Sequence, residues 1–129
     1  MTKNSFGKEN ITKEQCRSSL NSISDAMFVI GGKWKLRIIL ALTEGDKRFN
    51  ELQRMIDGIS AKVLSTELKD LELNGFVRRR VFTGSPVVVE YELTDYAETL
   101  KPVLKSLSEW GAKHKEKIRK SMRMKEQMS

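Results

Sequence analysis

Residues 58–81, GISAKVLSTELKDLELNGFVRRRV, join a turn, an amphipathic helix and a strand with no spacer between them. Ser60 is a good N-cap for a helix that runs to about Leu73, and Gly75 predicts its end. After Gly75 the composition changes to the β-branched and aromatic residues typical of a strand. Three leucines at spacings of four and three predict the buried stripe of the helix: Leu64, Leu68 and Leu71.

The opposite side of this helix is small, polar and basic, and the acidic residues lie mostly toward its C-terminal half. A polyanion approaching the N-terminal end would meet lysines, hydroxyls and the positive end of the helix dipole together. The alternative is a solvated helix face with no ligand. The candidate contacts on this helix are Ser60, Lys62, Ser65, Thr66 and Lys69.

Two more helices are expected just before this one. Residues 33–45, KWKLRIILALTEG, predict a helix that is buried on most of its surface and that Gly45 ends, and Phe49–Ile56 predict a short helix that Asp57-Gly58 ends. Two short helices joined by a tight turn make a helix-turn-helix, whose second helix usually reads the major groove of DNA. The cations Lys33, Lys35 and Arg37 stand in the first turns of the 33–45 helix, where they either face solvent, as we expect for Arg37, or bind an anion.

A β-hairpin is expected after the amphipathic helix, with strands at 76–82 and 87–93 and a tip at 83–86. Arg78, Arg79 and Arg80 occupy consecutive positions, so they cannot all face one side. The predicted fold is mostly helical with a two-stranded β-wing, a winged helix-turn-helix that is dimeric. Further DNA contacts are expected at Arg48, Arg80, Thr83, Gly84 and Ser85.

The ends of the chain predict a flexible arm and a long helix. The first dozen residues are polar, Lys13–Ser22 give a weak helix pattern, and Ala26–Ile30 form a short apolar run with Ser24 and Asp25 as N-caps. From Thr94 or Asp95 a last helix is expected, in which Pro102 produces a kink or marks a new start. The expected divisions are an arm at 1–22, a winged domain at 23–94, a dimerisation helix at 95–120 and a basic tail at 121–129.

An apolar stripe on the last helix exceeds what one small core requires. It predicts a partner helix from a second copy; the alternative is packing against the domain's own back. The candidate dimer residues are Leu100, Val103, Leu104, Leu107 and Trp110.

Charge and residue counts narrow the classes of function. The net charge of +7 favours a nucleic-acid partner over an acidic one. Cys16 is the only cysteine and His114 the only histidine, so neither a cysteine zinc site nor a Ser-His-Asp arrangement is expected, and we expect no cofactor and no metal. No apolar run is long enough to span a bilayer and no secretory signal begins the chain, so a cytoplasmic location without membrane contact is expected.

An ordered set of segments resembles the HxlR-type winged-helix transcriptional regulators of bacteria, within the MarR-like superfamily: VIGGKWKLRIILAL, RFNEL, GISAKVLSTELKDLELNGFVRR, VEYELT and LSEWGAKH. The resemblance runs from about Ile23 to His114. It implies a homodimer with two wings on a palindromic operator, in which the N-terminal region and the last helix form the dimer surface. It also implies a departure, because many members carry a cysteine where this chain has Asn21, and Cys16 lies five positions earlier.

These observations predict a sequence-specific DNA-binding regulator, a repressor of transcription that acts as a homodimer on double-stranded DNA. A winged-helix module for protein interaction is the alternative, and so is a redox-responsive regulator that senses through Cys16. A small-molecule effector is compatible with this architecture, although no residue specifies one. An enzyme is the least favoured class, because no cluster of His, Cys or carboxylate residues supports a reaction.

Overall fold

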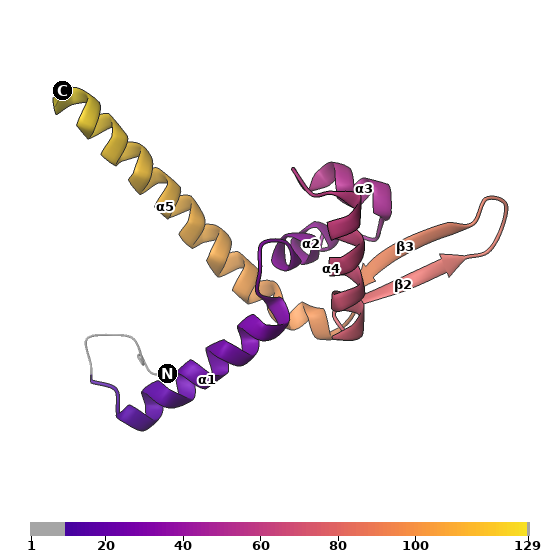
Figure 1. Cartoon of the computed structure of the whole chain (residues 1–129), viewed down its shortest axis with the longest axis horizontal. Coiled ribbons are helices and arrows are strands. Elements are labelled where there is room, and N and C mark those ends of the chain that lie inside the picture. The colour runs from indigo at the N-terminus through magenta and orange to yellow at the C-terminus, as the bar shows by residue number, and fades with distance from the viewer. Residues whose placement is uncertain (1–9, 129) are drawn as a thin grey trace.

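The structure is a computed structural model that describes residues 10–128 of the 129-residue chain. Its elements are α1 (Lys13–Ile30), α2 (Lys35–Leu42), β1 (Lys47–Arg48), α3 (Phe49–Met55), α4 (Ala61–Leu73), β2 (Val77–Phe82), β3 (Val88–Leu93), the 3-10 helix η1 (Tyr96–Leu100) and α5 (Lys101–Met128). Figure 1 shows α2, α3 and α4 at the centre, the β2–β3 hairpin reaching out on one side, and α1 and α5 leaving on the other. The predicted mostly helical fold with a β-wing is confirmed.

The N-terminal helix α1 is one unbroken helix, so the prediction of a short helix to Ser22 followed by a separate segment from Ala26 is wrong. Thr12 begins the helix through a reciprocal cap: its Oγ1 accepts from the Gln15 amide at 3.0 Å, and Gln15 Oε1 accepts from the Thr12 amide at 2.8 Å. The expected boundary after residue 22 therefore falls inside α1. Residues 1–9 of the expected arm lie outside the described residues.

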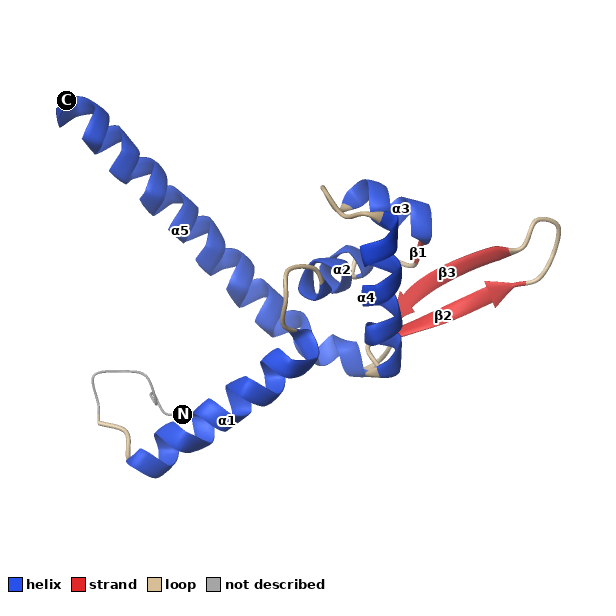
Figure 2. Ribbon diagram, viewed as in Figure 1, coloured by secondary structure: helices blue, strands red, loops and turns tan. Residues whose placement is uncertain are grey.

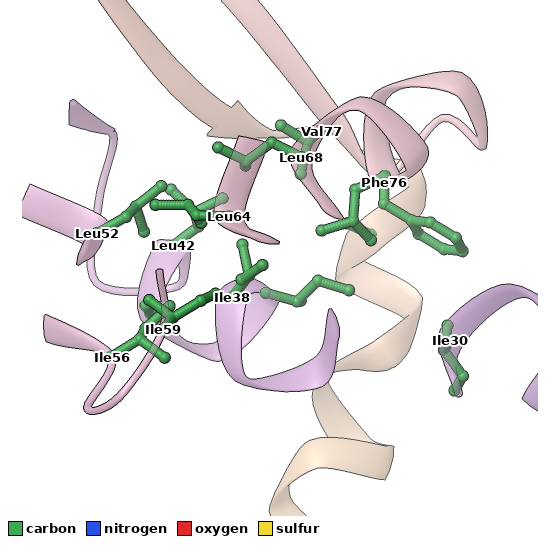
Figure 3. Close-up of a cluster of buried hydrophobic side chains, with 14 of the residues drawn as sticks. Ile30, Ile38, Leu42, Leu52, Ile56, Ile59, Leu64, Leu68, Phe76 and Val77 are labelled. Atoms are coloured by element: carbon green, nitrogen blue, oxygen red, sulfur yellow. The ribbon is translucent and has the colours of Figure 1, made fainter. Parts of the chain in front are cut away.

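The hydrophobic core lies between the three central helices and the base of the hairpin. The α4 leucines point into it as predicted, and Leu64 and Leu71 are fully buried. Figure 3 shows Leu64 and Leu68 among side chains from α2, α3 and β2. Each fully buried leucine stabilises the fold by about 1.5–3 kcal/mol relative to an exposed one. This burial fixes which side of α4 remains in solvent.

The junction between α4 and β2 is short and fully hydrogen-bonded. Gly75 has a φ of 82°, the left-handed conformation that was predicted to end the helix. The Gly75 amide donates to the Glu72 carbonyl at 3.1 Å, and the Phe76 amide donates to the Leu71 carbonyl at 2.9 Å. Phe76 is itself buried. The chain therefore passes from helix to strand through one turn, in which the carbonyls of Leu71 and Glu72 both accept a hydrogen bond.

The sheet has three antiparallel strands in the order β1-β3-β2, where the sequence predicted two. The hairpin strands were expected within one residue of their observed bounds. The additional strand, β1, is two residues long and pairs Lys47 with Tyr91 and Arg48 with Glu90. It joins the start of α3 to the base of the hairpin (Figure 2).

The last helix begins later than expected. The Ala97 amide donates to Thr94 Oγ1 at 3.3 Å, but this contact starts η1, and α5 begins only at Lys101. Pro102 occupies the second position of α5, so of the two expected outcomes it marks a new start. The helix then continues without a break through residues 121–128, which were expected to be a separate tail.

Candidate nucleic-acid interface

The surface of α4 away from the core carries the predicted cations and hydroxyls. Lys62, Thr66 and Lys69 are exposed, and Ser65 is half-buried. Because the leucines hold the other side of the helix, these four side chains face outward together. The N-terminus of α4 adds unsatisfied amides, although the Ser60 Oγ already accepts from the Val63 amide at 3.1 Å.

The hydroxyls of this surface have different capacities for a ligand. The Ser60 oxygen is engaged by Val63, so its O–H remains free to donate to a phosphate oxygen. The Thr66 O–H donates to the Lys62 carbonyl at 3.1 Å, so in this rotamer its oxygen can only accept. An amino group on a base edge donates, whereas a phosphate does not. Thr66 is thus suited to a base edge and Ser60 to the backbone.

Two acidic residues of α4 pair with one lysine of α2. Lys35 Nζ lies 2.7 Å from Glu67 Oε1 and 3.3 Å from Asp70 Oδ2. The hydrogen bond with Glu67 raises the pKa of Lys35 above its usual value despite the opposing effect of burial. Lys35 is therefore an internal partner and not an anion contact, which decides between the two alternatives for this lysine. The sequence showed that Lys35 places a charge in the first turn of a buried helix, but it did not show that Glu67 and Asp70 are its partners.

Two cations at the start of α2, one just before the helix and one inside it, lie against an aromatic ring. Lys33 Nζ is 4.9 Å and the Arg37 guanidinium carbon 5.3 Å from the centre of the Trp34 ring, and both side chains are exposed. The expectation that Arg37 faces solvent is confirmed.

The three arginines of β2 divide between the two faces of the hairpin. Arg78 donates to Glu92 at 2.8 Å, and Arg80 lies 3.5 Å from the same carboxylate and over the Phe82 ring. Arg79 alternates to the other face, which is the face that Val77 buries against the core. Arg80 was predicted as the DNA contact of the strand, but it is already engaged by Glu92.

Arg79, which was not selected from the sequence, lies beside the polar face of α4. A hollow of about 340 Å³ separates α4 from the sheet. Its lining combines two cations with two hydroxyls and one acid, so an anionic group can enter between helix and wing. The lining residues are Ser65, Leu68, Lys69, Glu72, Arg79 and Tyr91.

The remaining predicted contacts lie at the margins of this surface. Thr83, Gly84 and Ser85 are exposed at the tip of the hairpin, well away from α4 (Figure 1). Arg48 is exposed at the start of α3, where its backbone amide donates to Glu51 Oε1 at 2.8 Å. The structure therefore brings the α4 residues together and adds Arg79, while the tip residues form a separate group.

The predicted dimer residues do not all remain available. Leu104 is buried in the core of its own chain, and Leu100 is partly buried against it. Val103, Leu107 and Trp110 are exposed. The core of the same chain thus takes part of the stripe, and the rest of the stripe stays exposed.

Cys16 is exposed on α1. Within residues 10–128, no group of three or more His, Cys, Asp or Glu side chains is arranged to hold a metal ion. None of the helices described there combines the length and apolar content needed to cross a bilayer.

Comparison with known proteins places this geometry in a family. Residues 29–119 match the family model described as HxlR-like helix-turn-helix. An uncharacterised HTH-type transcriptional regulator of Halalkalibacterium halodurans, BH0655, is 45% identical over 104 residues, covering 76% of this chain and 92% of its own. The regulator YdeP of Bacillus subtilis is 38% identical over 98 residues, covering 76% and 77% of the two chains.

Solved structures agree with the sequence relatives. The HTH-type regulator YtcD superposes with a TM-score of 0.69 at 42% identity, covering 71% of this chain and 94% of its own. The redox regulator HypR in its reduced form has a TM-score of 0.71 at 35% identity, covering 77% and 98%. The chain belongs to the HxlR-like helix-turn-helix family and is a transcriptional regulator with a helix-turn-helix DNA-binding domain.

Proposed function

We propose that the protein is a sequence-specific repressor that binds a palindromic operator as a homodimer. The observation that carries this proposal is the division of α4 into a buried leucine side and an exposed side with Lys62, Ser65, Thr66 and Lys69. The second helix of a helix-turn-helix lies in the major groove, where lysines bind phosphates or guanine edges and hydroxyls reach bases. Arg79 extends the cationic surface onto the wing.

Exposed apolar side chains on α1 and α5 support the homodimer. Both helices leave the domain on the side opposite the hairpin (Figure 1). Water-exposed apolar groups gathered in this way are typical of a protein interface. A two-fold pair of chains places two α4 helices about one DNA turn apart, which suits a palindrome. The side chains are Leu20, Ile23, Met27 and Phe28 of α1 and Val103, Leu107 and Trp110 of α5.

Repression requires no chemistry from the protein. A dimer that occupies about two turns of promoter DNA excludes polymerase from the same sequence. An in vitro transcription assay on a promoter that overlaps the bound sequence tests the sign of regulation. A fall in transcript is expected, and a rise would show an activator.

The DNA-binding claim is tested by selecting bound duplexes from a random pool and measuring affinity for the selected duplex. We expect a symmetric sequence. Lys62→Ala plus Lys69→Ala should weaken binding at least about tenfold and lower the salt slope by about two, one for each lysine taken from a phosphate. The control, Lys13→Ala plus Lys105→Ala, removes the same charge from α1 and α5. Weak binding that is indifferent to sequence would favour a protein-interaction module instead.

Redox control through Cys16 is a second candidate, favoured by the exposure of this thiol and by the similarity to a structure named as a redox regulator. Because each chain has one cysteine, a disulfide would link two chains. Diamide should change the affinity for the selected duplex in the native protein and not in Cys16→Ser. An equal response of both proteins would rule out Cys16 as the sensor.

A further inference from the structure

The C-terminal part of α5 concentrates the positive charge of the chain. Residues 112–128 contain seven of the 24 lysines and arginines but only two of the 17 acidic residues. Most of the net charge of +7 therefore belongs to this segment and not to the winged domain. An explanation of what the positive charge of this protein binds therefore has to include α5.

This segment is fully available to a partner. From Lys105 to Met128 no residue is buried, and only Glu116 is partly covered. The helix leaves the domain on the side opposite the hairpin (Figures 1 and 2). Its cations therefore do not join the surface formed by α4 and Arg79.

Three lysines of this segment form a compact cationic face. Lys113, Lys117 and Lys120 line one shallow hollow of about 400 Å³ and lie within about 10 Å along the helix axis, at 1.5 Å rise per residue. The nearby acid Glu116 is engaged by Arg119 at 2.8 Å and by Arg123 at 3.7 Å. Among the described residues the three lysines make no ion pair of their own. Their charge is left for an external anion.

Two exposed apolar side chains of the segment continue the line of Leu107 on a different side of the helix, whereas Met124 lines the same hollow as the three lysines. Leu107, Ile118 and Met122 recur at spacings of eleven and four, which place them on one side of the helix, and all three are exposed. They continue the exposed apolar stripe of α5 that the proposed homodimer would cover. The lysine face therefore stays in solvent when the apolar stripe is covered.

We propose that the lysine face of α5, defined by Lys113, Lys117 and Lys120, binds the phosphate backbone of a second DNA duplex. One molecule then holds two duplexes, a proposal that rests on operator binding by α4. Phosphate binding needs cations, and Met124 is the one apolar side chain that lines the hollow between these three lysines. A membrane-surface helix instead presents a broad apolar side between its cations. The contact reads no base sequence, because lysines on phosphates carry none.

A bridging assay tests the proposal. Beads carry the duplex selected for α4 binding, and a fluorescent duplex of scrambled sequence is added with the full-length protein. We expect the protein to retain the scrambled duplex on the beads at low salt. Lys113→Gln plus Lys117→Gln plus Lys120→Gln should abolish this retention while leaving affinity for the bead-bound duplex within about twofold. Glutamine keeps the helix propensity of lysine, so α5 remains folded.

The matched control, Lys13→Gln plus Lys101→Gln plus Lys105→Gln, has the same net charge and should retain the scrambled duplex. In direct titrations with scrambled duplex the lysine-face variant should lower the salt slope by about three. Undiminished retention by that variant, no retention by the native protein, or binding of anionic phosphatidylserine vesicles without binding of scrambled duplex would each overturn the proposal.

Operator binding by α4 and binding of a second duplex by α5 can be contradicted independently of each other. Lys62→Ala plus Lys69→Ala is expected to lose the preference for the selected duplex and to keep its affinity for scrambled duplex through α5. If that variant binds the selected duplex normally, the role of α4 is wrong. If it no longer binds scrambled duplex, the role of α5 is wrong.

Discussion

Lys35 of α2 and Glu67 of α4 form an ion pair with an Nζ–Oε1 distance of 2.7 Å, and only 13% and 22% of their side-chain surfaces are exposed. The pair joins the first helix of the central group to the helix that carries the candidate DNA contacts. It also removes one acidic charge from the surroundings of Lys62 and Lys69. Lys35, an internal ion-pair partner, thus influences the charge of the α4 surface that carries the candidate DNA contacts.

Replacing Lys35 with methionine should destabilise the fold by about 1.5 kcal/mol, because a half-buried carboxylate is deprived of a charged hydrogen bond. Chemical denaturation measures this difference. Lys101→Met is the control: its ion pair with Glu98 has the same 2.7 Å distance, but both side chains are about half exposed. The control should cost less than about 1 kcal/mol. Equal destabilisation of the two variants would show that burial of the pair is unimportant.

Arg79→Gln should weaken binding to the selected duplex about tenfold and lower the salt slope by about one, since Arg79 lies beside α4 at the hollow shared with Lys69. Arg78→Gln removes the same charge from the other face of the hairpin, where Arg78 pairs with Glu92. Its effect on affinity should be smaller. Fluorescence anisotropy at several salt concentrations makes the comparison. A larger effect from Arg78 would place DNA on the opposite face.

Leu107→Glu should convert the proposed dimer into a folded monomer of 14.8 kDa, because it places a charge on the exposed apolar stripe of α5. Leu104→Ala should instead destabilise the domain by about 3 kcal/mol, because Leu104 is buried within its own chain. Sedimentation equilibrium and thermal unfolding separate the two effects. A dimer that survives Leu107→Glu would move the interface away from this part of α5.

Acid should remove one contribution to the stability of the hairpin. The hydrogen bond from Arg78 and the charge of Arg80 lower the pKa of Glu92 below its ordinary value of 4.5. A lowered folded-state pKa stabilises the fold above pH 4.5, and this stabilisation disappears as pH falls through the lowered value. Glu92→Gln should therefore be less stable than the native protein at neutral pH and equal to it in strong acid. Urea unfolding across this range checks the sign.

Helix α4 was predictable because its signals are local. Ser60, the leucine spacing and Gly75 lie within sixteen residues, and each acts on its neighbours along the chain. Strand β1 was not predictable, because two residues carry no periodicity and Lys47 pairs with Tyr91, far away in sequence. The single helix α1 was readable from Thr12 and Gln15, a capping-box pattern, but its serines suggested a break.

The candidate site shows the same limit. The alternation of Arg78, Arg79 and Arg80 was evident, but which face each occupies depends on the burial of Val77. The partner of Lys35 depends on how α2 packs against α4. Residue type therefore predicted which polar side chains of α4 are exposed together, and tertiary packing decided which arginine and which lysine were already engaged.

Phe76 follows α4 after only two residues, and its amide is hydrogen-bonded to the Leu71 carbonyl. Helix α4 and the wing are therefore held together at their junction. Thr94 closes the other side of the hairpin base by bonding to Phe76 and Gly75, so no hinge remains between them. A signal that releases this regulator from DNA therefore cannot fold the wing away from α4; in the proposed dimer it would act by changing the distance between the two protomers.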